Sequence, residues 1–266
     1  MPILNPNDEE WTGELAADPP VALRAALEAS RLAHYDAAQN AFDYPAFACS
    51  PEYESLRAAA EALAGFDCGA LGIGQRLPFW INVYNALVLH AVIARGVTDS
   101  VRSVGDFYGD SRYEVEGQEF SLDDIEHGLL RANQPVRRGA RRPMREGDPR
   151  QRLAPILFDE RVHFAMYSAC RSSPWLETFA EAGLDIQLEA TTRRYLGAHV
   201  RLGPGCSALF VPKLFDWYEA DFGGNEGVRS FVISRLERDE DVDAVDRRGG
   251  RVALKYLEYD WALNSR

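Results

Sequence analysis

The feature that most constrains the fold is an apolar run at residues 79–94. Within LPFWINVYNALVLHAVIARG, apolar residues fall on almost every side of a helix, and Gly96 stands where a helix C-cap glycine is expected. A membrane span needs about 20 predominantly apolar residues, and Asn82, Asn85 and His90 interrupt this shorter run. The run therefore predicts a buried central helix against which the rest of the chain packs.

Two amides lie within this predicted helix. Asn82 and Asn85 are three positions apart, so their side chains share one face. Buried amides need hydrogen-bond partners, which either the chain or a ligand supplies. We include both among the expected substrate-binding residues.

Helical and extended patterns alternate along the remaining sequence. Amphipathic helices are predicted over 20–42 and 51–64, so residues 1–74 form a helical N-terminal portion. A hairpin turning near Gly117 precedes a helix with a capping box at Ser121 and Asp124. The other predicted elements are a buried strand over 161–168, helical spacing over 175–198, a short strand and two helical pieces within 208–240, and a closing strand over 251–264.

This pattern predicts the α+β class. We expect a single domain over residues 1–266, with a mixed or antiparallel sheet packed against the central helix and several amphipathic helices. A chain of 266 residues is long enough to bury a substantial core.

Charge and cysteine usage bear on partners and compartment. The 41 acidic and 29 basic side chains give a net charge of -12, which disfavours nucleic acid and anionic membranes as partners. The four cysteines form no CxxC pair, and the first residues lack a basic and apolar leader. We therefore expect a cytoplasmic protein with reduced thiols, no cofactor and no metal; the oligomeric state is left open.

The stretch RVHFAMYSACRSSPWL, residues 161–176, combines the residue types of nucleophilic active sites. A strand ending at Ser168 would present Ser168 and Cys170 beside a turn whose N–H groups, together with Arg171, favour an oxyanion. The same residues also fit a core strand running into a loop, with Cys170 as a small buried apolar residue.

Spacing limits which histidine can serve as the base. In a straight strand His163 lies about 16 Å from Ser168 and on the opposite face. His127, next to Glu126 on the capped helix, is the better candidate, although adjacent helix positions diverge by about 100°. His127, His163 and Glu126 are thus candidate catalytic residues.

An arginine-rich loop follows the capped helix. Five arginines lie between residues 137 and 145, with prolines and glycines around them, which predicts an exposed loop. The loop suits either a solvated surface or an anion-binding patch for a carboxylate or phosphate.

Five ordered motifs resemble the bacterial and plant family known as domain of unknown function 547. They are FWINVYNA, SLDDIEHGLLR, RVHFAMYSACRSSP, WYEADF and YDWALN, spread over a family-like core at about 75–264. The resemblance implies one α+β domain and a distant likeness to the papain and transglutaminase-like cysteine hydrolases. Carried over by position, the matching residues are Glu126, His127, Arg131, His163 and Arg171.

The family pattern N-C-G-A-R-S-C-P differs from this chain at its cysteines. Ser168 and Ser173 replace both of them, and Cys170 stands between. A serine hydroxyl needs a well-placed general base, unlike a low-pKa thiol. Three outcomes stay open: Ser168 is the nucleophile, Cys170 substitutes through a shifted turn, or covalent catalysis is lost.

Two functions therefore compete. One is a hydrolase or acyltransferase acting on a small amide, peptide or thioester, with Arg171 and Arg131 binding substrate. The other is a non-catalytic module that keeps the pocket for a small-molecule or peptide ligand. A metal site formed by His127, His163, Glu126 and Asp260 has no tight ligand spacing in its favour.

Overall fold

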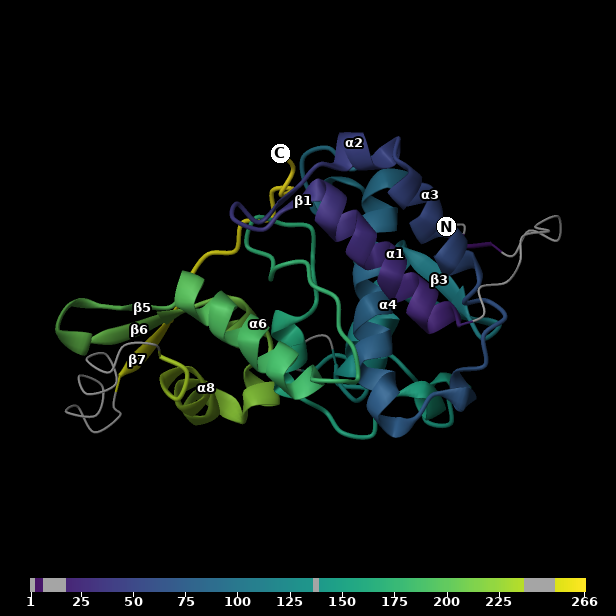
Figure 1. Cartoon of the computed structure of the whole chain (residues 1–266). Helices are drawn as coiled ribbons and strands as arrows, with labels where there is room; N and C mark the ends of the chain where they lie inside the picture. The colour runs from purple at the N-terminus through teal and green to yellow at the C-terminus, as the bar shows by residue number, and fades with distance from the viewer. Residues whose placement is uncertain (1–2, 7–17, 136–138, 237–251) are drawn as a thin grey trace. The chain divides into compact units, whose positions relative to one another are not determined.

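The computed structural model describes residues 3–6, 18–135, 139–236 and 252–266, which divide into two compact units (Figure 1). Unit 1 contains residues 1–184 together with 261–266, and unit 2 contains residues 185–260. The α+β class is confirmed, because helices dominate both units and the strands form small sheets. The sequence patterns gave no sign of the boundary near residue 184, and a single folding domain stays a prediction.

Unit 1 begins with helices that match the amphipathic patterns. α1 (Pro19–His34) packs against α3 (Pro51–Glu61) and α4 (Ile73–Ala94). The predicted helix over 20–42 is too long, because after His34 the chain forms β1 (Tyr35–Asp36) and β2 (Ala41–Phe42), an antiparallel pair. The remaining short helical pieces before α4 are α2 (Tyr44–Ala48) and η1 (Cys68–Ala70).

The central helix α4 confirms the prediction of a buried core helix. Its side chains are buried from Pro78 to Val92, and Gly96 has a left-handed φ of 62° just beyond the C-cap. It is long and apolar enough to cross a membrane, but 83% of its apolar window is buried. This packing is typical of the core helix of a soluble protein.

A hairpin follows α4, as predicted. After η2 (Val101–Ser103) and α5 (Phe107–Asp110), strand β3 (Arg112–Val115) pairs with β4 (Gln118–Ser121). Glu116 and Gly117 both have positive φ, which suits a two-residue turn between twisted strands. The hairpin leads directly into η3 (Asp124–Leu130).

The strand predicted over 161–168 is wrong. After η4 (Pro149–Leu153), the chain forms a 3₁₀ helix, η5 (Glu160–Phe164). The Asp159 carboxylate accepts the Arg161 N–H at 3.0 Å and caps this turn. The 3₁₀ turn buries three consecutive residues, Val162, His163 and Phe164. A short run of residues that are all buried is also expected of a strand in the core, which explains the wrong assignment.

The helix predicted over 175–198 begins later than expected. Residues 174–180 form no helix or strand, and α6 starts only at Leu184, running to His199. The Asn82 amide pairs with both backbone groups of Phe179, accepting its N–H at 2.9 Å and donating to its carbonyl at 2.8 Å. These bonds engage backbone groups that a helix would otherwise use, so the segment is not helical despite its helical spacing.

Unit 2 contains a mixed three-stranded sheet. β6 (Ala208–Val211) pairs antiparallel with β5 (Arg201–Leu202) and parallel with β7 (Ala253–Tyr256). The predicted closing strand over 251–264 is therefore too long. The helical pieces of this unit are α6, η6 (Pro204–Cys206), α7 (Leu214–Trp217), η7 (Glu219–Phe222) and α8 (Gly224–Ile233).

Residues 261–266 belong to unit 1, where Asn264 joins three segments. Its Oδ1 accepts from the hydroxyls of Tyr44 and Tyr167 at 2.9 and 2.8 Å, and its Nδ2 donates to the carbonyl of Asn40 at 2.8 Å. Its N–H donates to the carbonyl of Ala169 at 3.1 Å. The last residues of the chain thus bind both the N-terminal helical region and the segment that carries Ser168.

Candidate functional site

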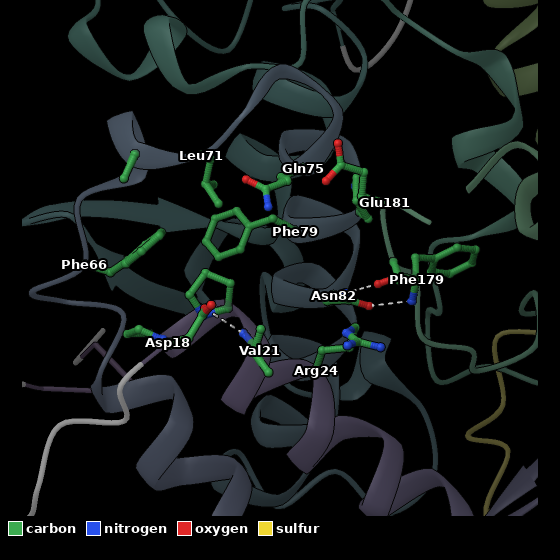
Figure 2. Close-up of a pocket in the computed structure, with 15 residues that line it drawn as sticks. Asp18, Val21, Arg24, Phe66, Leu71, Gln75, Phe79, Asn82, Phe179 and Glu181 are labelled. Carbon is green, nitrogen blue, oxygen red and sulfur yellow. Dashed lines mark hydrogen bonds between the residues drawn. The ribbon is translucent and has the colours of Figure 1, made fainter. Parts of the chain in front are cut away.

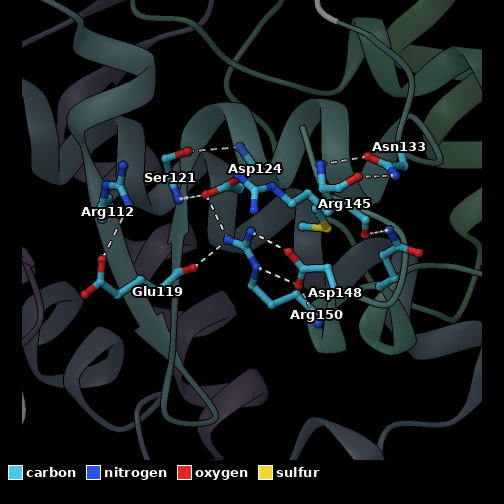
Figure 3. A network of polar contacts seen from close by, with 10 residues as sticks. Arg112, Glu119, Ser121, Asp124, Asn133, Arg145, Asp148 and Arg150 are labelled. Carbon is cyan, nitrogen blue, oxygen red and sulfur yellow. Dashed lines mark hydrogen bonds and ion pairs between the residues drawn. The ribbon is translucent and has the colours of Figure 1, made fainter. Parts of the chain in front are cut away.

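The helix that carries Glu126 and His127 has π geometry. Arg131 N–H donates to the carbonyl of Glu126, five residues earlier, at 2.8 Å. Such geometry is rare and is found frequently at functional sites. Ser121 and Asp124 cap its start, with two reciprocal backbone to side-chain bonds of 3.1 and 3.0 Å, which confirms the predicted capping box (Figure 3).

The buried imidazole of His127 is held in one tautomer. Arg131 Nη1 lies 2.8 Å from Nδ1, and a guanidinium can only donate. Nδ1 must therefore accept, so the ring is neutral and carries its proton on Nε2. Nε2 in turn lies 3.7 Å from the Asp123 carboxylate, one helical turn earlier. The pair provides a proton donor and a carboxylate on one face.

Asp123 is a titratable residue of this cluster that the sequence analysis did not single out. Burial, reinforced by the negative charges of Glu126, Asp106 and Asp124, raises the pKa of Asp123 to about 7. Its side chain is still 36% exposed, whereas that of His127 is 3% exposed. The Asp123 carboxyl therefore lies between the buried imidazole and the solvent. The adjacent pair of aspartates in SLDDIEH was the available signal, because neighbouring carboxylates disfavour each other's ionisation.

Glu126 completes this cluster from the protein interior. Its Oε2 accepts from the Tyr84 hydroxyl of α4 at 3.2 Å, and its Oε1 lies 3.7 Å from His127 Nδ1. Arg131 also donates to the carbonyl of Pro135 at 3.1 Å. The structure therefore brings together Glu126, His127 and Arg131, which the sequence singled out, and adds Asp123.

Asn82 and Asn85 bind the backbone of the neighbouring segment. Asn85 Oδ1 accepts the N–H of Tyr167 at 2.9 Å, and its Nδ2 donates to the carbonyls of Ala165 and Glu177 at 3.1 and 3.3 Å. Asn82 binds Phe179 in the same way. The expectation that these buried amides need partners is confirmed, and the partners are backbone groups on both sides of Ser168.

Ser168, Ala169 and Cys170 form a tight loop. The N–H of Ser168 donates to Ser173 Oγ at 2.8 Å, so the two positions where the family pattern has cysteine are in contact. Ala169 has a left-handed φ of 58°. Cys170 is fully buried, and its thiol donates to the carbonyl of Ser168 at 3.2 Å. Ser168 is half-buried and is the more accessible of the two candidate nucleophiles.

The short helix α5 lies beside both groups of residues. Tyr108, on α5, donates its hydroxyl to the carbonyl of Ser168 at 3.3 Å. Asp106, which caps α5, is one of the charges that raise the pKa of Asp123. The Ser168 loop and the Asp123–His127 cluster are thus neighbours of the same element.

His163 and Arg171 lie at the two ends of the same segment. His163 is buried in η5, where its ring packs 6.4 Å from that of Phe158. Arg171 is exposed, and its N–H donates to the carbonyl of Ala262 at 2.9 Å. The separation of His163 and Ser168 expected from a straight strand no longer applies, because the intervening chain turns.

The arginine-rich loop is attached to the His127 helix at its base. The side-chain amide of Asn133 accepts the N–H of Met144 and donates to its carbonyl, both at 3.0 Å (Figure 3). The Met144 side chain packs directly on Gly128. Arg141, Arg142 and Arg145 are exposed, as predicted. The predicted contributions of Arg137 and Arg138 lie outside the described residues.

An ion network secures the other end of the loop. Arg150 Nη1 lies 3.1 Å from Asp124 and donates to the carbonyl of Glu119 at 3.0 Å, while Nη2 lies 2.9 Å from Asp148 (Figure 3). This network ties η4 to the capped end of η3. It fixes the orientation of the helix that carries His127.

Within the described ranges, no three His, Cys, Asp or Glu side chains are grouped so that they could hold one metal ion. This applies to His127, His163, Glu126 and Asp260, which were considered together above.

Comparison with known proteins places part of the chain beside one protein family. The sequence model of a family described as "Protein of unknown function, DUF547" matches residues 70–196, which include α4, η3 and the Ser168 loop. No curated protein and no solved structure matches the chain. The likeness to papain and transglutaminase-like architecture therefore stays a prediction.

Proposed function

Because residues 70–196 belong to the DUF547 family, whose description assigns no activity, we propose a function from the site: hydrolysis or acyl transfer on a small amide, peptide or thioester. The observation that carries the proposal is the Asp123–His127 pair, a carboxyl with a pKa of about 7 beside an imidazole of fixed tautomer. Groups that titrate near neutral pH are suited to moving protons in such reactions.

In the proposed reaction, Ser168 Oγ attacks the carbonyl carbon of the substrate. The hydroxyl proton passes to the base, for which the Asp123 carboxylate beside the His127 Nε2–H is the first candidate and His163 is the second. The same group then protonates the leaving amine or thiol, giving an acyl-serine that water or an acceptor amine cleaves. Arg171 binds an anionic part of the substrate, and Arg131 positions His127.

Cys170 is the weaker candidate nucleophile. Its side chain is fully buried, and its thiol is bonded to the carbonyl of Ser168. A nucleophile has to reach substrate, so this placement favours a packing role for the thiol. The proposal includes a cytoplasmic location, a small-molecule or peptide substrate, and neither nucleic acid nor membrane as partner.

The test uses a fluorophosphonate probe on the full chain, with mass spectrometry to locate the label. We expect labelling at Ser168 in native but not in urea-unfolded protein. Ser168→Ala should abolish it, Cys170→Ala should retain it, and Asp123→Asn with His127→Gln should slow it about 100-fold. Equal labelling of native and unfolded protein, or none at Ser168, would contradict the proposal.

A non-catalytic binding module is the second candidate. The observation in its favour is that Ser168 and Ser173 occupy both family cysteine positions and are bonded to each other. Two results together would support this alternative. The native protein would not react with the probe, and it would bind a substrate amide with the same affinity as Ser168→Ala does.

A further inference from the structure

Unit 1 contains a cavity of about 540 Å³ whose lining includes none of the residues assigned above to acid–base or nucleophilic chemistry (Figure 2). Its walls come from the first turns of α1, the loop at 66–71, the N-terminal half of α4 and the segment at 179–181. This volume is within the range of sites that hold small organic ligands. Asn82 is the only one of the expected substrate-binding residues in this lining.

The floor of the cavity is apolar and largely aromatic. Phe66 and Phe79 lie with ring centroids 5.9 Å apart, and Leu71, Pro78 and Phe179 extend the same surface. Phe179 is held in place by the two Asn82 bonds that Figure 2 draws. A bulky apolar group would fit against this fixed surface.

One cation and one anion stand on the same side of the cavity, flanking Asn82 (Figure 2). Arg24 supplies the only basic side chain of the lining, and Glu181 supplies a carboxylate. Neither side chain makes a hydrogen bond or ion pair with any residue that the structure describes. Both charges are therefore available to a ligand.

The surroundings fix where each ligand charge is recognised. α1 begins with Pro19 and Pro20, which have no N–H, and the next N–H is taken by Asp18 at 3.2 Å. The start of α1 therefore offers few donors to an anion, and Arg24 is left as the anion-binding group. The Glu181 carboxylate lies directly over Gly74, where a Cβ would be 2.5 Å from Oε1.

We propose that this cavity binds a zwitterionic, peptide-like ligand with a bulky apolar side chain. The ligand's carboxylate pairs with Arg24, its ammonium pairs with Glu181, and its side chain packs on Phe66, Phe79 and Phe179. The Gln75 amide, whose oxygen accepts the Gly72 N–H at 2.8 Å, keeps its NH₂ group to donate to a ligand carbonyl. The proposal does not depend on catalysis at Ser168.

The test is calorimetric binding of three probes to the full chain: the dipeptide Phe-Leu, its N-acetyl derivative, which lacks the ammonium, and its C-terminal amide, which lacks the carboxylate. Removing one charge-assisted contact from a partly exposed site costs about tenfold in affinity. We therefore expect Phe-Leu to bind about tenfold more tightly than either derivative. The same preference should hold in Ser168→Ala, which separates this site from the proposed reaction.

Two variants test which side chain binds each charged group of the ligand. Arg24→Gln should bind Phe-Leu and its amide equally well, whereas Glu181→Gln should bind Phe-Leu and its N-acetyl form equally well. Matched controls are Arg57→Gln and Glu54→Gln, which remove one member of an exposed ion pair of 3.2 Å on α3. Both controls should keep the wild-type preferences.

Ala70→Trp tests the cavity itself, since Ala70 lines it at an exposed position. This variant should lose binding of all three probes while its melting temperature stays close to that of the wild type. Equal affinity of the wild type for the three probes, no binding of any probe, or unchanged binding in Ala70→Trp would each overturn the proposal.

Discussion

Ala169 holds a left-handed backbone conformation between the two candidate nucleophiles. This conformation costs roughly 1–2 kcal/mol for a residue with a Cβ, and glycine avoids it at an entropic cost of about 0.5–1 kcal/mol. Ala169→Gly should therefore raise the free energy of unfolding by about 0.5 kcal/mol, measured by urea denaturation. Glycine is also the residue of the family pattern at this position.

The matched control for Ala169→Gly is Ala29→Gly, at an exposed position inside α1. The same substitution should there lower stability by about 1 kcal/mol, because the helix already suits alanine. If Ala169→Gly lowered the free energy of unfolding as Ala29→Gly does, the backbone at Ala169 would not be strained.

The pKa of Asp123 predicts a pH dependence of stability. It is about 7 in the folded protein, above its value of about 4 in an unfolded chain, so the folded state binds this proton more tightly. The resulting stabilisation is complete below about pH 4 and is lost as the pH rises through about 7. Asp123→Asn mimics the protonated form permanently.

Thermal unfolding checks this sign. The melting temperature of Asp123→Asn minus that of the wild type should be larger at pH 8.5 than at pH 6, with the variant the more stable at pH 8.5. A difference that is constant with pH would mean that the carboxyl titrates alike in the folded and unfolded states.

At the residue scale, sequence reasoning found groups but not their environments. Glu126, His127 and Arg131 stood out because the motif places them on one capped helix. The tautomer of His127 was beyond reach, since it depends on a 2.8 Å contact that π geometry creates. The role of Asn85 was equally hidden, because its partners are backbone groups about 80 residues away in sequence.

At the element scale, the start of α8 depends on Gly227. A Cβ there would collide with the carbonyl oxygen of Phe222, which is a backbone atom and cannot rotate away as a side chain could. Gly227→Ala should destabilise unit 2 by more than about 3 kcal/mol, because α8 has to move away from η7. Hydrogen exchange over 214–233 reads this out locally.

Gly65→Ala is the control, because no atom lies within 4 Å of the added Cβ. Its exchange pattern and melting temperature should match those of the wild type. Normal protection over 214–233 in Gly227→Ala would mean that the approach of α8 to Phe222 is looser than described.

Elements were predictable where local signals agreed with tertiary packing. α4, the hairpin at Gly117 and the capped start of η3 all have local capping or turn chemistry, and all were found. The segments at 161–168 and 174–183 were misassigned, because Asp159 and Asn82 overrule the periodicity through hydrogen bonds. Such bonds leave no periodic trace in a sequence.

At the scale of the whole molecule, Asn264 joins residues 261–266 to segments more than 90 residues earlier in the sequence. Asn264→Ala would leave the buried hydroxyls of Tyr44 and Tyr167 and the carbonyl of Asn40 without this partner. We expect a loss of about 3 kcal/mol in the free energy of unfolding, because the Asn40 carbonyl loses its buried donor and the two hydroxyls keep only their 2.7 Å bond to each other. Urea denaturation measures it.

A double-mutant cycle with Tyr167→Phe separates this bond from general packing. Tyr167→Phe should cost less in the Asn264→Ala background than in the wild type, since the hydroxyl has already lost one acceptor. Additive costs would contradict a direct coupling through the 2.8 Å bond.

Whole-molecule organisation was the least predictable level. The YDWALN motif resembles the end of a closing strand, yet β7 ends at Tyr256 and the final residues return to unit 1. The return to unit 1 is made by long-range contacts, such as the hydrogen bond from the Arg171 N–H to the Ala262 carbonyl. A pattern confined to neighbouring residues does not contain them.

The same return has a consequence for biosynthesis. Unit 2 interrupts the sequence of unit 1, so residues 261–266 are synthesised after all of residues 185–260. Until then the carbonyl of Ala169 and the hydroxyl of Tyr167 lack Asn264. A nascent chain that has made all the candidate catalytic residues would still lack part of the support of the Ser168 loop until residues 261–266 have also been made.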